Sequence, residues 1–288
     1  MGTIVYLNGQ FVSKEEAKVS IFDHGYLLGD GIFETLRSYG GVIFKLEEHL
    51  QRLFNSAKYM MLALPVSKAE LADLAYQTLE KSSLQDAYLR ITVSRGVGER
   101  GINPDFCKEP TLSIIVKEVP EYPPESYAVG IEAMIVGVRK ISHESLSPQI
   151  KSCNYQNNIL AKIELNQRGL LEGFLLNHEG YLAEGTVSNV FIVKNGNILT
   201  PSPACGCLEG ITRQTVIELA QKELQLGVQE TQLTRYDLYT AAECFITNTI
   251  MELMPVVNID GRVVGNGQPG ALTRQLHALF QALARSER

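Results

Sequence analysis

One lysine, Lys151, stands among small polar residues in SPQIKSCNYQNNILAKIE, immediately before a helical pattern begins. A long amine at this position could point either into water or into a pocket, and an amine in a pocket could act as a nucleophile. Ile159 and Ile163, with Leu160 beside them, recur at the spacing of one buried helix stripe, and Lys151 lies just outside that stripe. Most lysines point into water, so the alternative interpretation is a solvated side chain.

Three further positions could contribute to the same chemistry. Glu184, in GYLAEGTVSNVFIV, is either a solvated carboxylate in a turn or an acid held near a buried base. Arg52 lies beside the apolar stripe of its helix, where the alternative is a surface pair with Glu48 four residues earlier. Gly210 and Thr212 precede another helical pattern; we expect Thr212 to be its N-cap, and the N–H groups of a helix start can bind phosphate.

The segment RGVGERG contains the pattern GxGxxG at Gly96, Gly98 and Gly101. A dinucleotide site needs a helix directly after this pattern, because the helix N-terminus binds the pyrophosphate. The residues INPD follow instead, so we interpret the segment as a loop that joins two strands. Arg95 and Arg100 in this loop could pair with a substrate carboxylate.

The surrounding elements mix strands and helices. Asn8-Gly9 and Gly40-Gly41 predict hairpin turns, and Ser67 with Glu70 predicts a capping box at a helix start. Later helices are expected at about 154–168, 213–225 and 270–285, between short β runs. This order favours an α+β fold over a strictly alternating parallel sheet.

Three prolines in PEYPPESYA predict a semi-rigid connector over residues 120–128. We therefore expect a small N-terminal domain over 1–119 and a larger domain over 129–288.

Composition narrows the class of protein. The chain has 288 residues, is 45% hydrophobic and 20% charged, and carries a formal net charge of −6 without runs of like charge. Nucleic-acid and membrane-surface partners therefore have no electrostatic support, and no apolar segment approaches the roughly 20 residues of a membrane span. Five cysteines in no regular framework suggest free thiols in a reducing cytoplasm, and the five scattered histidines do not suggest a metal site.

Taken in order, the motifs resemble one family closely, the class IV (fold-type IV) pyridoxal-phosphate enzymes. This family includes branched-chain aminotransferases, D-amino-acid aminotransferases and 4-amino-4-deoxychorismate lyases. The resemblance covers nearly the whole chain, through SIFDHGYLLGDGIFETLR, EEHLQRLFNSA, IKSCNYQNNILAKIE, GYLAEGTVSNVF, LTPSPACGCLEGITR and FITNTIMELMPV. It implies a small α/β N-terminal domain, a larger C-terminal domain with a β-barrel-like core, and a homodimer whose active sites lie between the domains and are bordered by the partner subunit.

The resemblance also implies a role for each matching residue. Lys151 corresponds to the lysine that bonds to the aldehyde of pyridoxal 5′-phosphate, and Glu184 to the acid that keeps the pyridine nitrogen protonated. The implied phosphate contacts are Arg52, Ile211, Thr212 and Thr249. The other implied cofactor contacts are Tyr155 at the phenolic oxygen, Val187 and Leu208 at the ring faces, and Asn248.

The implied substrate positions are Leu28, Phe33, Thr35, Tyr88, Arg90, Arg100 and Ile250. AYLRITV, KSCNYQNNILAKIE and the aromatic Phe33 are similar to the branched-chain aminotransferases. Leu28 replaces their usual pocket tyrosine, Thr35 replaces a glycine, and the larger Ile250 and Met251 should reshape the pocket.

Other members of the family stay open as alternatives. FETLR, SRGVGERG and EGTVSNVF are similar to the aminodeoxychorismate lyases, which release pyruvate and 4-aminobenzoate. The Arg-x-His carboxylate trap of D-amino-acid aminotransferases is missing, because Ile102 stands two residues after Arg100. We expect a transaminase that acts on amino acids of the branched-chain type and 2-oxo acids, then a lyase, then a D-amino-acid transaminase. A non-catalytic relative that binds a metabolite is a further hypothesis, and an NAD(P) oxidoreductase a distant one.

Overall fold

The computed structural model describes residues 3–99 and 101–286 and divides into two compact units. The first unit contains Met1–Pro120, Ile150–Asn154 and Ala284–Arg288, and the second contains Glu121–Gln149 and Tyr155–Leu283. The short segment Ile150–Asn154, which carries Lys151, thus belongs to the first unit although the chain around it belongs to the second. Among the described residues, no helix has the length and apolar character that crossing a membrane requires.

The first unit is built on a six-stranded antiparallel sheet with the order β2-β1-β6-β5-β3-β4. Its strands are β1 (Ile4–Leu7), β2 (Gln10–Ser13), β3 (Gly31–Tyr39), β4 (Val42–Ile43), β5 (Ala87–Ser94) and β6 (Thr111–Glu118). Both predicted hairpins are confirmed, with Asn8-Gly9 between β1 and β2 and Gly40-Gly41 between β3 and β4. All four of these turn residues have positive φ, as a tight hairpin turn that matches the strand twist requires.

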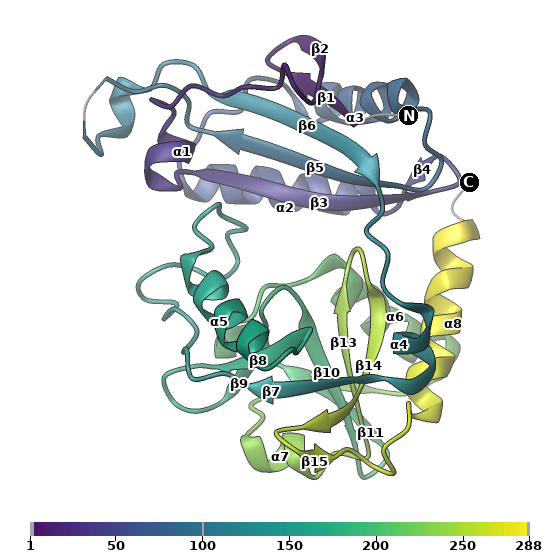
Figure 1. The fold of residues 1–288 in the computed structure, drawn as a ribbon. Coiled ribbons are helices and arrows are strands. Elements are labelled where there is room, and N and C mark those ends of the chain that lie inside the picture. The colour runs from purple at the N-terminus through teal and green to yellow at the C-terminus, as the bar shows by residue number, and fades with distance from the viewer. Residues whose placement is uncertain (1–2, 100, 287–288) are drawn as a thin grey trace. The chain divides into compact units, whose positions relative to one another are not determined.

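Two long helices, α2 (Leu46–Tyr59) and α3 (Lys68–Ser82), pack against each other and against this sheet (Figure 1). The predicted capping box is present at the start of α3, where Ser67 and Glu70 bond to each other's backbone N–H groups. A short helix, α1 (His24–Leu28), precedes β3. The apolar side chains of β5 alternate, so Leu89, Ile91 and Val93 are buried while their neighbours Tyr88, Arg90 and Thr92 are only partly buried.

The loop from β5 to β6 confirms that GVGERG is not a dinucleotide fingerprint. The two strands pair antiparallel, and the described part of the loop contains only the short 3₁₀ helix η1 (Pro104–Phe106). In that part, no α-helix start lies where a pyrophosphate would need one. Arg100 lies outside the described residues.

The second unit contains a mixed nine-stranded sheet that curls around its core. The order is β12-β11-β10-β13-β14-β7-β8-β9, with β15 paired to β14. Its strands are β7 (Ile131–Ile135), β8 (Glu172–Leu176), β9 (Leu182–Gly185), β10 (Asn189–Lys194), β11 (Asn197–Pro201), β12 (Val228–Thr231), β13 (Glu243–Asn248), β14 (Glu252–Ile259) and β15 (Arg262–Val263). Its helices are α4 (Pro124–Val129), α5 (Gln156–Gln167), η2 (Pro203–Cys205), α6 (Ile211–Glu223), α7 (Arg235–Tyr239) and most of α8 (Ala271–Ser286). The predicted α+β class is confirmed.

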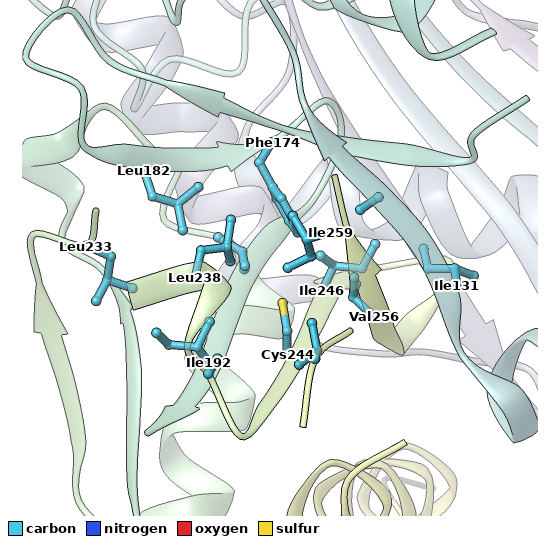
Figure 2. Packing of buried hydrophobic residues seen from close by; sticks show 14 of the residues in the cluster. Ile131, Phe174, Leu182, Ile192, Leu233, Leu238, Cys244, Ile246, Val256 and Ile259 are labelled. Atoms are coloured by element: carbon cyan, nitrogen blue, oxygen red, sulfur yellow. The ribbon is translucent and has the colours of Figure 1, made fainter. Parts of the chain in front are cut away.

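The core of the second unit is a continuous apolar cluster contributed by most of its strands (Figure 2). Phe174, Ile192, Ile246 and Ile259 are fully buried members of this cluster. Burial of large apolar side chains is the main stabilising contribution to such a core, at roughly 25 cal/mol per Å² of apolar surface removed from water. The cluster thus fixes the strands whose ends carry the polar residues described below.

The predicted buried stripe of α5 is wrong. Ile159, Leu160 and Ile163 are 50, 46 and 48% exposed, whereas Ala161 and Leu165 are buried against the sheet. Residues 159 and 163 point roughly opposite to residues 161 and 165, because each helical residue turns by about 100°. The apolar periodicity therefore predicted one apolar face of α5 correctly, but the face that is buried against the sheet is a different one.

Candidate active site

The position of Lys151 is set by the edge of β3. The Phe33 N–H donates to the Lys151 carbonyl at 2.9 Å, and the Cys153 N–H donates to the Gly31 carbonyl at 2.8 Å. Ser152 forms a β-bridge with Ile32 between these two bonds. The segment around Lys151 is thus joined to the edge of β3 by an isolated β-bridge, and this pairing fixes the backbone that carries the amine.

The amine of Lys151 lies over the aromatic ring of Phe33 on β3. Its Nζ is 4.8 Å from the centroid of the Phe33 ring, and the Arg90 guanidinium is 3.7 Å from the same centroid. Phe33 itself is buried. Cations in this range are attracted to the ring quadrupole, so Phe33 helps to hold both side chains in place.

Arg52 on α2 does not pair with Glu48, the partner considered for a surface arginine. Its Nε and Nη2 donate to the two carboxylate oxygens of Glu34 on β3 at 2.7 and 2.8 Å. His49 Nδ1 contacts the same carboxylate at 2.8 Å. Glu48 pairs instead with Lys45 at 3.2 Å. The bidentate geometry fixes the plane of the Arg52 guanidinium.

The contacts among Glu34, His49 and Arg52 set the protonation of the Glu34 carboxyl and the His49 ring. Burial alone would raise the pKa of the Glu34 carboxyl, but the positive charge of Arg52 and the hydrogen bonds from Arg52 and His49 lower it to about 2. Burial lowers the pKa of His49, and the positive charges of Arg52 and Lys151 lower it further, against the effect of Glu34. Near neutral pH, Glu34 is therefore ionised and His49 neutral, with its Nδ1–H donating to the carboxylate.

The other described substrate candidates of this unit are Leu28, Thr35, Tyr88 and Arg90. Thr35 is directly opposite Arg90 in the β3–β5 register, two residues from Phe33 on the same face of the sheet. Tyr88 stands two residues before Arg90, so it shares that face. Leu28 ends α1 and is 46% exposed. This face of the sheet thus collects three of the predicted substrate residues with Phe33.

Arg95, which we expected could pair with a substrate carboxylate, is already paired with a carboxylate of the chain. Its guanidinium forms a bidentate pair with Asp30 at 2.5 and 3.1 Å. It also donates to the carbonyls of Met60 and Met61. These bonds fasten the start of the β5–β6 loop to the end of α2.

In the second unit, Glu184 is a buried carboxylate on β9. Its Oε2 accepts the Leu208 N–H at 2.9 Å, and its Oε1 forms an ion pair with Lys140. The Leu208 carbonyl accepts from Asn189 Nδ2 at 2.8 Å, so both backbone polar groups of Leu208 are bonded to side chains. The predicted pyridine-nitrogen acid and one predicted ring-face residue are thus in direct contact.

Helix α6 begins at Ile211 with Gly210 as its N-cap, so the prediction of Thr212 as N-cap is wrong. None of the described side chains caps this helix start, and the Thr212 side chain is buried in the first turn. An added Cβ at Gly210 would come within 2.1 Å of Asn189 Oδ1, which explains why a capping serine or aspartate does not fit there. The uncapped N–H groups of the first turn are suitable donors for a phosphate.

Asn248 holds two turns of the second unit together. Its Nδ2 donates to the Val187 carbonyl at 3.2 Å, and its Oδ1 accepts from the N–H groups of Ile250 and Met251 at 2.9 and 2.8 Å. Thr249 lies inside the turn that Asn248 folds, and Ile250 is buried. The backbone contacts of its amide make Asn248 a residue that positions Val187 and Thr249.

The last cofactor candidate, Tyr155, stands at the N-cap position of α5 and is partly buried. The predicted residues thus form two sets. Lys151 and Arg52 lie with Phe33 in the first unit, while Tyr155, Glu184, Val187, Leu208, Ile211, Thr212, Asn248 and Thr249 belong to the second.

Sequence reasoning missed four charged or polar residues of these sets. Glu34, His49, Lys140 and Glu172 are partly or fully buried and bond to candidate residues or their neighbours. A signal for two of them was present, because Glu34 directly follows the apolar pair Ile32–Phe33 in β3 and Glu172 begins the otherwise apolar strand β8. A buried acid requires bonding partners, so such a position predicts a polar network.

Both units contain donors that fit the parts of pyridoxal phosphate. The first holds an amine and an oriented guanidinium, and the second holds a paired carboxylate and an uncapped helix start. An amine suits an aldehyde, a carboxylate suits a protonated pyridine, and guanidinium and helix N–H groups suit a phosphate. Each unit by itself therefore carries groups that suit some parts of the cofactor that the sequence motifs imply.

Comparisons with known proteins agree with this chemistry. The family model described as Amino-transferase class IV matches residues 31–259. A protein of Methanocaldococcus jannaschii, whose name assigns it provisionally to the branched-chain-amino-acid aminotransferases, is 47% identical over 277 residues, covering 96% of this chain and 95% of that one. The aminodeoxychorismate lyase of Bacillus subtilis is 34% identical over 280 residues, covering 96% of this chain and 94% of that one.

The fold is also that of a solved structure in this group. The branched-chain amino acid aminotransferase of Escherichia coli has a TM-score of 0.95 and 33% sequence identity, over 100% of this chain and 96% of that one. The fold-type IV architecture expected from the resemblance is confirmed by this likeness.

Proposed function

Because the chain belongs to the class IV aminotransferase family, we propose that it uses pyridoxal 5′-phosphate to move an amino group between a branched-chain amino acid and a 2-oxo acid. The observation that carries this proposal is the placement of Lys151. Two backbone hydrogen bonds, which form the Ile32–Ser152 β-bridge, join its segment to the edge of β3. Its amine shares the Phe33 ring with Arg90.

Lys151 has the central role in the proposed reaction. Pyridoxal phosphate, when bound, supplies an aldehyde that takes the amino group and a conjugated ring that delocalises the electrons of the substrate α-carbon. With the cofactor bound, Lys151 Nζ would hold its aldehyde. When not bonded to the cofactor, the same nitrogen would move the proton at the substrate α-carbon.

The other proposed contacts orient the cofactor. Arg52 binds the phosphate with a guanidinium that Glu34 holds in one plane, and the first turn of α6 adds N–H donors. Glu184 holds a proton at the pyridine nitrogen, while Lys140 and the Leu208 N–H keep its carboxylate in place. Tyr155 and Thr249, with Val187 and Leu208 at the two ring faces, complete the proposed contacts as the family resemblance implies.

Apolar side chains at the proposed substrate positions favour a branched-chain amino acid. Phe33 and Ile250 are buried, and Leu28 is apolar and half exposed. Apolar pocket walls select an aliphatic side chain, while a buried polar group would select a polar one. The strong identity to the relative from Methanocaldococcus jannaschii supports the same substrate class.

We also propose that the protein is a homodimer. Four apolar residues in and just before α1, which is labelled in Figure 1, are each more than half exposed: Ile21, Phe22, Tyr26 and Leu27. The Ile159–Leu160–Ile163 face of α5 is a second exposed apolar surface. Contiguous apolar patches on a folded chain mark interaction surfaces.

The dimer is tested by sedimentation velocity at micromolar concentration. We expect the wild type to sediment as a dimer and Phe22→Lys to shift toward monomer. Val263→Lys, at an exposed valine of the second unit, serves as the matched control and should remain dimeric. A monomeric wild type would refute the proposal.

The reaction is tested by single-turnover half-reactions. Holoprotein is mixed separately with L-leucine, L-glutamate and D-alanine, and formation of pyridoxamine 5′-phosphate is followed by absorbance; pyruvate release from aminodeoxychorismate is measured in parallel. We expect conversion with L-leucine and L-glutamate. Conversion with D-alanine alone would replace the proposal with a D-amino-acid transaminase, and pyruvate release without conversion by any amino acid would replace it with a lyase.

A further inference from the structure

The short turn between β9 and β10 is held by a buried carboxylate that the proposed reaction does not use. Glu172 opens β8 and is 1% exposed. Its Oε1 accepts the N–H and the hydroxyl of Thr186 at 2.8 and 2.5 Å, and its Oε2 accepts the Ser188 hydroxyl at 2.9 Å. The N–H of Val187 adds a longer bond of 3.3 Å.

Only a carboxylate suits this position. The groups that face it from residues 186 to 188 are all donors, and a carboxylate offers two oxygens that only accept. An amide at position 172 would place an NH₂ group against donors and leave some of them buried without an acceptor. Gly185 is required for the same packing, because an added Cβ would come within 2.2 Å of Ser188 Oγ and 3.1 Å of Glu172 Cδ.

The three carbonyl groups of the turn also accept hydrogen bonds. The Thr186 carbonyl accepts from Asn158 Nδ2 of α5 at 2.6 Å, and the Val187 carbonyl accepts from Asn248 at 3.2 Å. The Ser188 carbonyl accepts the Gly185 N–H at 2.6 Å. Both backbone groups of Val187 are bonded, and the residue is 54% exposed.

We propose that Glu172 is a positioning residue that sets Val187 against the ring of the bound cofactor, through the turn of Thr186–Ser188. This inference rests on the proposed function, because it takes Val187 as a ring-face residue. Glu172 touches neither substrate nor cofactor. It acts on the ring end of the cofactor, whereas the phosphate end is assigned to Arg52 and the start of α6.

This division of roles gives a test with two ligands. Full-length protein stripped of cofactor is titrated with pyridoxamine 5′-phosphate, which has both ring and phosphate but needs no bond to Lys151. Inorganic phosphate, which lacks the ring, is titrated as its competitor. For Glu172→Gln we expect the dissociation constant of pyridoxamine 5′-phosphate to rise at least tenfold, while the inhibition constant of phosphate stays within threefold of the wild type.

Glu243→Gln is the matched control. Glu243 is another carboxylate of the second unit, and it accepts two backbone N–H groups and the Thr273 hydroxyl at the start of α8. Loss of the Glu243 carboxylate should lower the melting temperature. It should leave the dissociation constant of pyridoxamine 5′-phosphate and the inhibition constant of phosphate within threefold of the wild type. Ser188→Ala removes one donor and keeps the carboxylate, and we expect it to weaken pyridoxamine 5′-phosphate binding three- to tenfold. If Glu172→Gln does not fold, this variant tests the role of Glu172.

The outcomes separate this inference from the proposed function. A wild type that does not bind pyridoxamine 5′-phosphate overturns both. A wild type that binds it, with Glu172→Gln and Ser188→Ala binding equally well, overturns only the inference. Equal weakening of both ligands in Glu172→Gln also overturns it, because the carboxylate would then only support the fold.

Discussion

Replacement of Glu34 by glutamine tests the buried charge cluster of the first unit. The carboxyl has a pKa of about 2 in the folded protein against an ordinary value of 4.5. A difference of this size corresponds to roughly 3 kcal/mol of unfolding free energy at neutral pH, at about 1.4 kcal/mol for each pKa unit. A loss of roughly 3 kcal/mol also matches the usual cost of removing one partner from a buried ion pair.

The sign of the pH dependence follows from the lowered pKa. The folded protein holds Glu34 ionised more strongly than the unfolded chain does, so the contribution is complete above the ordinary pKa of 4.5 and disappears as pH falls through about 2. At pH 3 we expect roughly 1 kcal/mol of the Glu34 contribution to the unfolding free energy to remain. The stability difference between wild type and Glu34→Gln should therefore narrow on acidification.

The measurement is urea unfolding followed by far-UV circular dichroism at pH 7 and pH 3. Glu118→Gln, at an exposed carboxylate near the end of β6 in the same unit, is the control and should leave the unfolding free energy nearly unchanged at both pH values. A Glu34→Gln variant as stable as the wild type at pH 7 would refute the reasoning. So would a stability difference that is the same at both pH values.

Two further expectations concern glycine and thiols. Gly210→Ala should weaken pyridoxamine 5′-phosphate binding at least fivefold in an equilibrium titration, because its Cβ would come within 2.1 Å of Asn189 Oδ1. The control Gly227→Ala, with no atom within 4 Å of its Cβ, should bind as the wild type does. Equal binding by both variants would contradict this expectation. Burial raises the pKa of Cys205 and of Cys244, and it raises the pKa of Cys207 to about 12. These three thiols should therefore react with Ellman's reagent at pH 8 only after urea is added. Immediate release of five equivalents from the folded protein would be inconsistent with their burial.

Local features of the fold were predictable from the sequence. The Asn8-Gly9 and Gly40-Gly41 hairpins and the Ser67–Glu70 capping box form because neighbouring residues dictate the backbone geometry. The loop at GVGERG was also predictable, because the residues after it do not begin a helix. In these cases, every group that decides the outcome lies within a few residues.

Partners distant in sequence were not predictable in this way. Arg52 pairs with Glu34, 18 residues away on a strand, while its local candidate Glu48 pairs elsewhere. The pairing of residues 151–153 with β3 joins segments more than 100 residues apart. Periodicity in α5 showed where its apolar residues lie, but the small Ala161 packs against the sheet and Ile159 and Ile163 remain exposed.

The candidate site was found from the sequence mainly as a set of residue types. Lys151, Glu184 and the start of α6 carry recognisable neighbours, so their motifs mark them as candidates. Glu172 and Lys140 have no such motif, and only the folded chain reveals that they hold the turn around Val187 and the carboxylate of Glu184. Residues that position others are harder to predict, because their partners define them.

The attachment point of the cofactor tests the central claim most directly. Holoprotein is reduced with borohydride, which fixes pyridoxal phosphate to the amine that carries it, then digested and mapped by mass spectrometry. We predict one labelled peptide, with the pyridoxyl group on Lys151 and none in Lys151→Ala. A label on Lys140 or any other lysine, or no label in the wild type, would contradict the account.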